Sequence, residues 1–241
     1  MRLFYLIITL LSLTNCARFV DVDHEVEKTI VNLSKMGLTE IPPAVFENKS
    51  IRVLKLYGNK ITEIPADISK LENLEKLYLG KNLLTSLPES IRNLKKLKLI
   101  SAQYNDISSL PSSIGEMENL EQIILSHNNL KTLPKTIGLL QKLEVLKVSF
   151  NSLKSLPDEL GDCENLQFIH INQNNLREIP TSIVKLRRLR ELYVANAGVL
   201  VDLPEELCKL RYLEVLQIDQ TTLVPNCLLV RQTTQLRIIM N

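Results

Sequence analysis

Residues 74–94 read LEKLYLGKNLLTSLPESIRNL, and residues 120–140 repeat the pattern as LEQIILSHNNLKTLPKTIGLL. In both stretches leucine or isoleucine stands at positions 1, 4, 6, 11, 14, 18 and 21, asparagine at position 9 and proline at position 15. Prolines extend this register along the chain at intervals of 23 residues, with a last interval of 24: Pro42, Pro65, Pro88, Pro111, Pro134, Pro157, Pro180 and Pro204. A fixed period of roughly 20–50 residues is typical of a chain built from stacked repeats.

Each 23-residue unit predicts one coil of a solenoid. A single unit cannot bury its own leucines, so successive coils stack and share a continuous core. Leu77 and Leu79 alternate with polar neighbours at a period of two, which predicts one short strand per coil in a parallel sheet. Residues 87–94 predict a short helical or 3₁₀ segment on the opposite side, where proline suits the first turn. Since that side is bulkier, we expect a curved solenoid with the sheet on its concave face.

The unit L-x-x-L-x-L-x-x-N-x-L-x-x-L-P-x-x-I-x-x-L-x-x closely resembles the 23-residue class of the leucine-rich repeat family. The resemblance covers residues 28–241 and implies an α/β solenoid of about nine repeats and a partial tenth. In this family the concave surface generally binds protein ligands, and exported bacterial members resemble adhesins or host-interaction proteins. Combined with the amino-terminal segment described below, the repeat class is most similar to spirochaete leucine-rich repeat lipoproteins.

Asparagines recur at the same spacing and predict a ladder along the solenoid: Asn59, Asn82, Asn105, Asn128, Asn151 and Asn174. An amide side chain offers two N–H donors and one carbonyl acceptor, which can satisfy backbone groups left over where each strand turns inward. We therefore expect a structural role for the ladder.

The terminal repeats depart from the pattern, as the ends of a solenoid usually do. Met36 stands where the first asparagine belongs, and Ala197 and Thr221 replace the last ones. One residue is inserted between Val194 and Leu203, so the coil around residues 195–203 is expected to be the most irregular. Leu236 and Ile239 are expected to begin the tenth copy.

The first fifteen residues have the architecture of a secretory signal peptide. Arg2 precedes an apolar run at residues 3–11, and small and polar residues follow it. This run is too short to span a bilayer as a permanent helix, which needs about 20 residues. We expect residues 1–15 to be a signal peptide.

Residues 13–16 read Leu-Thr-Asn-Cys and resemble a bacterial lipoprotein processing site, in which Cys16 is lipidated and becomes the first residue. Asn15 departs from the usual glycine or alanine and is similar to the relaxed sites of spirochaete lipoproteins. The resemblance implies a cell-envelope protein, held on a bacterial membrane through the lipid anchor alone, with residues 16–27 as a linker. A secreted protein with an ordinary signal peptide is the alternative.

The charge balance argues against a nucleic-acid partner. Lys and Arg number 29 against 27 Asp and Glu, and a net charge of +2 is too small for the field that phosphate binding needs. Basic residues cluster in the turns at residues 95–98 and 185–190, whereas equivalent turns carry Glu72, Glu118 and Glu164. We interpret the clusters as solvated turns, with a patch for an anionic ligand as the alternative.

Few residues point to catalysis. The sequence contains no phosphate-cradling glycine loop, no G-x-S-x-G turn and no H-E-x-x-H motif. His127 and His170 are predicted on strands two coils apart, roughly 10 Å, which is too far to share one metal ion. We expect a monomeric, non-catalytic protein without cofactor or metal. An enzyme with a site near Tyr78, His127 and His170 is the competing hypothesis.

The cysteines of the repeats differ in their surroundings. Cys163 occupies a core position that holds leucine in other repeats, as at Leu140, so we expect a buried, inert thiol. Cys208 and Cys227 fall on neighbouring terminal coils and could form a disulfide in an oxidising compartment. The sequence leaves that pairing open, because it does not show whether the two Cβ atoms face one another.

The variable residues beside the strand leucines are expected to form the concave face, with these central positions: Asn32, Lys55, Tyr78, Ser101, Ile124, Lys147, His170, Tyr193 and Gln217. Aromatic side chains are over-represented at protein interfaces. We predict that a protein partner contacts the rings on or beside these positions: Tyr57, Tyr78, Tyr104, His127, Phe150, Phe168, His170 and Tyr193. The alternative for these residues is the ordinary preference of aromatics for strands. An intracellular scaffold or regulator is the alternative function.

Overall fold

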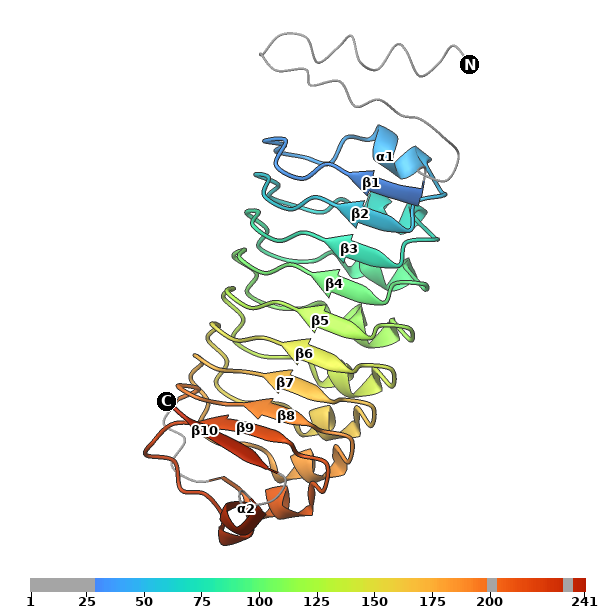
Figure 1. Ribbon diagram of the computed structural model, residues 1–241. Helices are drawn as coiled ribbons and strands as arrows, with labels where there is room; N and C mark the ends of the chain where they lie inside the picture. The colour runs from blue at the N-terminus through green and yellow to red at the C-terminus, as the bar shows by residue number, and fades with distance from the viewer. Residues whose placement is uncertain (1–28, 199–202, 232–235) are drawn as a thin grey trace, which may run out of the picture.

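The computed structural model describes residues 29–198, 203–231 and 236–241 and consists of stacked coils with one parallel sheet (Figure 1). The sheet has ten strands, and their order in space follows their order in the chain. The strands are β1 (Ile30–Asn32), β2 (Val53–Lys55), β3 (Lys76–Tyr78), β4 (Leu99–Ser101), β5 (Gln122–Ile124), β6 (Val145–Lys147), β7 (Phe168–His170), β8 (Glu191–Tyr193), β9 (Val215–Ile218) and β10 (Arg237–Met240). Each coil therefore adds one strand, which confirms the predicted solenoid.

The register of the sheet follows the 23-residue period. Leu54 pairs with Leu77, and Leu77 pairs with Ile100, so the middle residues of successive strands form one row. These three side chains are buried, with exposed fractions of 1% or less. Since side chains alternate along a strand, the first and third residues of each strand point away from the core. This outward side is the concave face of the solenoid.

Short 3₁₀ segments line the side opposite the sheet (Figure 1). They are η3 (Ala66–Lys70), η4 (Glu89–Asn93), η5 (Ser112–Glu116), η6 (Lys135–Leu139), η7 (Asp158–Asp162), η8 (Thr181–Lys185) and η9 (Glu205–Lys209), and an α-helix, α1 (Ala44–Glu47), replaces them in the first coil. The repeating proline lies immediately before each 3₁₀ segment in an extended conformation, as at Pro88 with ψ 150°. The expectation that proline occupies the first turn was therefore wrong by one position. The proline ring still fixes φ at a value that suits the extended residue leading into the 3₁₀ segment.

Leucine and isoleucine side chains from all coils form one continuous core. Burying one such side chain stabilises the fold by about 1.5–3 kcal/mol, so the sum over many coils offsets the entropy of ordering the chain. Cys163 lies fully buried at its leucine position, and its Sγ donates a hydrogen bond of 3.1 Å to the carbonyl of Ile137. Burial raises the pKa of the Cys163 thiol to about 12, which makes this cysteine unreactive at neutral pH.

The repeated asparagines hydrogen bond neighbouring coils together. Asn128 Oδ1 accepts from the backbone N–H of Ile107 at 3.0 Å, and its Nδ2 donates to the carbonyls of Ala102 and Leu125 at 3.0 and 2.9 Å. The same three kinds of bond recur at Asn59, Asn82, Asn105, Asn151 and Asn174. Each amide satisfies backbone groups of its own coil and of the preceding coil.

Near the inserted residue a different contact joins the coils. Ala197 is buried where the asparagine would lie, and the backbone N–H of Asn196 donates to both carboxylate oxygens of Asp219 at 2.9 Å. Gly198 adopts φ +143° and pairs with Leu176 of the preceding coil. The expected irregular coil falls partly on residues 199–202, which lie outside the described residues.

The last strand differs from its predicted register. Ile238 pairs with Leu216 and packs against the core, whereas Ile239 pairs with Gln217 on the concave side. The expectation that Ile239 continues the leucine pattern was wrong, because only 22 residues separate Leu216 from Ile238. The shorter final coil carries α2 (Asn226–Arg231) in place of a 3₁₀ segment.

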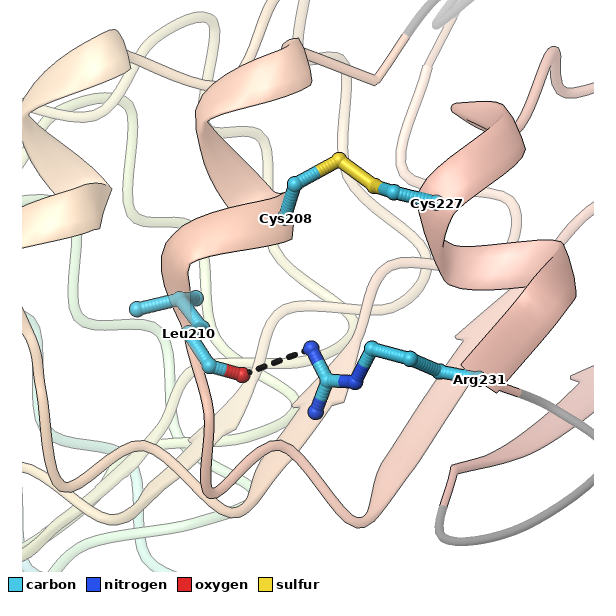
Figure 2. Close-up of a disulfide and its surroundings, with 4 residues drawn as sticks. All are labelled: Cys208, Leu210, Cys227 and Arg231. Carbon is cyan, nitrogen blue, oxygen red and sulfur yellow. Dashed lines mark hydrogen bonds between the residues drawn. A yellow bond between two sulfur atoms is a disulfide. The ribbon is translucent and has the colours of Figure 1, made fainter.

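A disulfide joins α2 to η9 and closes the carboxy-terminal end (Figure 2). Cys208 and Cys227 are bonded with their Cα atoms 5.9 Å apart, which answers the question that the sequence left open. The Arg231 guanidinium donates to the carbonyls of Leu210, Arg211 and Leu213 at 2.9–3.2 Å. A crosslink between cysteines this far apart in the sequence stabilises a fold by about 3 kcal/mol. The disulfide therefore fastens α2 of the last coil to η9 of the coil before it.

The predicted signal peptide, Cys16 and the linker at residues 16–27 lie outside the described residues. Within the described ranges, no helix has the length and apolar character needed to cross a membrane.

Candidate partner-binding face

The concave face consists of four columns of side chains that run along the solenoid. The central column holds the third residue of each strand, from Asn32 to Gln217, as predicted. The first strand residues form a second column: Ile30, Val53, Lys76, Leu99, Gln122, Val145, Phe168, Glu191 and Val215. The second residues beyond each central position form a third: Ser34, Tyr57, Gly80, Gln103, Ser126, Ser149, Asn172, Ala195 and Asp219.

The fourth column lies in the turn that follows each strand, where the backbone is left-handed. Its members have φ between 52° and 73°: Lys35, Gly58, Lys81, Tyr104, His127, Phe150, Gln173 and Asn196. A left-handed conformation costs roughly 1–2 kcal/mol for an L-residue other than glycine. The prediction that His127 lies on a strand was wrong, because β5 ends at Ile124 and His127 occupies this turn.

Three rings of the turn column stack on one another. The ring centroids of Tyr104 and His127 are 4.2 Å apart, and those of His127 and Phe150 are 4.1 Å apart, with planes inclined by 10°. Lys81 Nζ extends the column, at 5.5 Å from the Tyr104 ring centroid and 5.7 Å from that of Tyr57. The outer rings remain 45% exposed at Tyr104 and 47% exposed at Phe150. The stack therefore forms one aromatic ridge beside the sheet.

A hollow of about 410 Å³ lies on the concave face beside this ridge. Gly80, which has no side chain, is one of the residues that line it. A Cβ at this position would lie 3.1 Å from the Tyr57 ring and 3.3 Å from the Gln103 carbonyl oxygen. The lining residues are Ser34, Lys55, Tyr57, Tyr78, Gly80, Ser101 and Gln103.

A second group of polar and aromatic side chains lies on β7 and β8. The His170 and Tyr193 rings are parallel to within 1° at a centroid distance of 4.2 Å, and His170 Nε2 lies 3.1 Å from Glu191 Oε2. Burial lowers the pKa of His170 and outweighs the opposing hydrogen bond to the Glu191 carboxylate, while nearby Lys147 lowers the pKa further. Burial also raises the pKa of Tyr193, so at neutral pH both rings are uncharged.

The eight predicted binding residues all lie on this one face, but in separate groups. Tyr57 and Tyr78 line the hollow. The stack holds Tyr104, His127 and Phe150. Their neighbours on β7 and β8 are Phe168, His170 and Tyr193. Lys81 was missed by the sequence reasoning, because its importance depends on the left-handed turn that places its ammonium over two tyrosine rings.

The arrangement suits recognition of a partner. In the described part of the chain, no cluster of three or more His, Cys, Asp or Glu side chains could hold a metal ion. His170 and Glu191 form a pair in which the ring nitrogen is already hydrogen bonded. The face instead offers aromatic edges, ammonium groups and hydroxyl groups spread over many coils, which suits an extended partner.

Comparison with known families identifies the repeat. A family model described as leucine rich repeat matches residues 29–84, 118–176 and 141–199. The chain belongs to the leucine-rich repeat family. Domains of this family are typically used for protein binding and are usually non-catalytic. A comparison with curated proteins found no match.

Solved leucine-rich repeat structures resemble the chain over most of its length. A leucine-rich repeat protein of Leptospira interrogans is 29% identical with a TM-score of 0.64, covering 85% of this chain and 58% of that one. The ectodomain of an Arabidopsis thaliana receptor kinase, solved with Casparian strip integrity factor 2, is 27% identical with a TM-score of 0.72, covering 83% and 25%. An internalin of Listeria monocytogenes is 18% identical with a TM-score of 0.71, covering 86% and 57%, and shares the fold. The chain spans between a quarter and three fifths of the length of these structures.

The leucine-rich repeat scaffold explains why the face can vary without loss of the fold. Core leucines and ladder asparagines occupy the inward positions, so most residues in the four outward columns do not contribute to the shared core.

Proposed function

We propose that this leucine-rich repeat protein is an exported, non-catalytic binding protein that engages a protein partner through its concave face. The observation that carries the proposal is the stacked aromatic ridge of Tyr104, His127 and Phe150, whose outer rings are nearly half exposed. Exposed apolar surface gathered in one place is typical of interaction sites.

The energetics of the ridge support this role. An aromatic side chain buries about 150–250 Å² when it is fully covered. At about 25 cal/mol per Å², covering the exposed half of one ring contributes about 2 kcal/mol to binding. The ridge also retains aromatic residues in a backbone conformation that favours glycine or asparagine, and such strain clusters at functional sites.

The similar structures support the same proposal. The receptor kinase ectodomain that resembles this chain was solved in complex with a partner, Casparian strip integrity factor 2. The similar Leptospira protein and the internalin come from bacteria, which is in keeping with a bacterial host-interaction protein or adhesin.

Replacing Tyr78, Tyr104 and Phe168 together with serine should leave the fold intact and abolish partner capture, because three large contact surfaces are lost. The measurement is a pull-down from host-cell and bacterial membrane extracts, with bound proteins identified by mass spectrometry. The matched control replaces Tyr212 and Leu139 with serine, since these side chains are 65% and 61% exposed and lie away from the strands. If the triple serine variant still captures the partner and the control variant does not, the binding site lies away from the sheet.

We further propose that the protein is anchored to a bacterial membrane through a lipid on Cys16. The residues before Cys16 that resemble a lipoprotein processing site support this anchor. Metabolic labelling with radioactive palmitate should mark the wild-type chain, whereas Cys16→Ala should remain unlabelled. Equal labelling of both chains would exclude the anchor, and a soluble, uncleaved chain beginning at Met1 would favour an intracellular scaffold.

A further inference from the structure

The charges of the concave face are distributed unevenly along the solenoid. Over β1–β7 and the turns that follow them, its four columns contain five lysines: Lys35, Lys55, Lys76, Lys81 and Lys147. Within this same stretch, residues 30–173, the columns contain no aspartate or glutamate. The first carboxylates on the face are Glu191 in β8 and Asp219 beyond β9. A chain with a net charge of only +2 thus gathers positive charge on one side of its first seven coils.

We propose that the first seven coils bind an acidic, extended segment of a protein partner. This inference rests on the proposed function and specifies the chemistry of the partner. Complementary charge steers such a segment toward the face and selects against basic sequences.

Among the described residues, the five lysines of the concave face differ from the charged residues beside them, which form ion pairs. Immediately before the strands, charges of opposite sign pair from coil to coil, as in Arg52 with Glu75 and Lys98 with Glu121 at 4.0 Å. In the described part of the chain, no ion pair involves any of the five concave lysines. Their like charges are left to be balanced by a ligand or by solvent ions.

The hollow beside Gly80 provides a place for one carboxylate of the ligand. Lys55 supplies an ammonium group, and Ser34 and Ser101 supply hydroxyl donors. A hydrogen bond from a charged donor to a carboxylate is about twice as strong as one between neutral groups. Lys81 lies beside the hollow, over the Tyr57 ring, so a second positive charge faces the entering side chain.

The surface suits a polypeptide better than a nucleic acid. Single-stranded nucleic acids need open ring faces on which their bases stack. Here the faces of Tyr104 and His127 are covered by Lys81 and by neighbouring rings. Aliphatic side chains also lie on the same face as the lysines, and apolar side chains of a partner can pack against them: Val53, Leu99, Ile124 and Val145. An acidic segment with apolar residues between its carboxylates satisfies both features.

The carboxylates of the last coils limit the extent of the site. Glu191 Oε2 is already within 3.1 Å of His170, and Asp219 accepts from Asn196. An acidic ligand that continued past β7 would meet these two carboxylates and be repelled. The inferred site therefore ends at β7.

The test uses a fluorescent peptide of about ten residues, because seven strands about 4.8 Å apart span about 30 Å. Its sequence alternates glutamate with valine, and a second peptide alternates lysine with valine. Fluorescence anisotropy with the full chain should show binding of the acidic peptide that weakens as salt rises, and no binding of the basic peptide. The double change Lys55→Glu and Lys81→Glu should weaken binding at least about tenfold.

The control is the double change Lys95→Glu and Lys96→Glu, which alters the same number of charges in an exposed turn away from the strands. This control should retain the wild-type affinity. Equal loss in both variants would overturn the inference, as would tighter binding of heparin or of single-stranded DNA than of the acidic peptide.

The outcomes separate this inference from the proposed function. One outcome is that capture of the natural partner is lost when Tyr78, Tyr104 and Phe168 are replaced but is unchanged by Lys55→Glu and Lys81→Glu. This outcome would support the binding face and exclude an acidic segment as its ligand. Capture that is insensitive to the aromatic substitutions would contradict the binding face itself.

Discussion

Replacement of Asn128 by alanine should lower the free energy of unfolding by about 4 kcal/mol. Its amide makes three buried hydrogen bonds that join two coils, and alanine makes none of them. The N–H of Ile107 and the carbonyls of Ala102 and Leu125 would then lose these partners inside the solenoid. A buried polar group left unsatisfied costs about 1–3 kcal/mol, so three such groups account for the expected loss.

Urea denaturation followed by circular dichroism measures this effect. Asn129→Ala is the matched control, since Asn129 is the adjacent asparagine and is exposed. Its side chain makes one contact of 3.5 Å with Asp106, so the control should change stability by less than about 0.5 kcal/mol. Similar losses in the two variants would mean that the ladder does not hold the coils together.

The second large effect is expected for Gly138→Ala in η6. A Cβ at Gly138 would lie 2.3 Å from the backbone carbonyl oxygen of Glu159 in the next coil. Backbone atoms cannot move aside as a flexible side chain does, so η6 and η7 must separate. Overpacking of a well-packed core costs about 1–3 kcal/mol, and the upper end of this range is expected where backbone must move; a loss of about 3 kcal/mol corresponds to a fall in melting temperature of about 10 °C for a chain of this size.

Arg92→Ala is the control for the glycine change, because Arg92 lies two repeats earlier at the same position of the unit and is exposed. Its contact with Glu116, at 3.7 Å, is a surface ion pair of little energy. Differential scanning calorimetry should show a wild-type melting temperature for this variant. If the Gly138→Ala protein has the same melting temperature as the Arg92→Ala control, the coils of η6 and η7 are not in close contact.

The repeat period determined most of the fold, because inward positions must hold apolar side chains in every coil. Leu77 and Pro88 therefore predicted a strand and a turn that the structure contains. The register of the final coil was predicted incorrectly, because a shift of one residue between Leu216 and Ile238 changes which side chain faces inward. Periodicity carries no information about such a shift once the repeat is incomplete.

The binding face was only partly visible in the sequence. The rings of Tyr104, His127 and Phe150 could be assigned to one edge of the sheet by their spacing, but their stacking depends on left-handed turns without glycine. Nothing in those residue types encodes that conformation. The net charge also gave no indication of the lysines on the concave face, because a sum over the whole chain does not show which side carries the charges.

We expect the partner to bind the strand side of the solenoid. Lysine acetylation footprinting of the chain, with and without the captured partner, tests it most directly. Lys55, Lys81 and Lys147 should lose reactivity on binding, while Lys95 and Lys96 in their exposed turn should keep it. Protection of Lys95 and Lys96, with unchanged reactivity at the three concave lysines, would contradict the account.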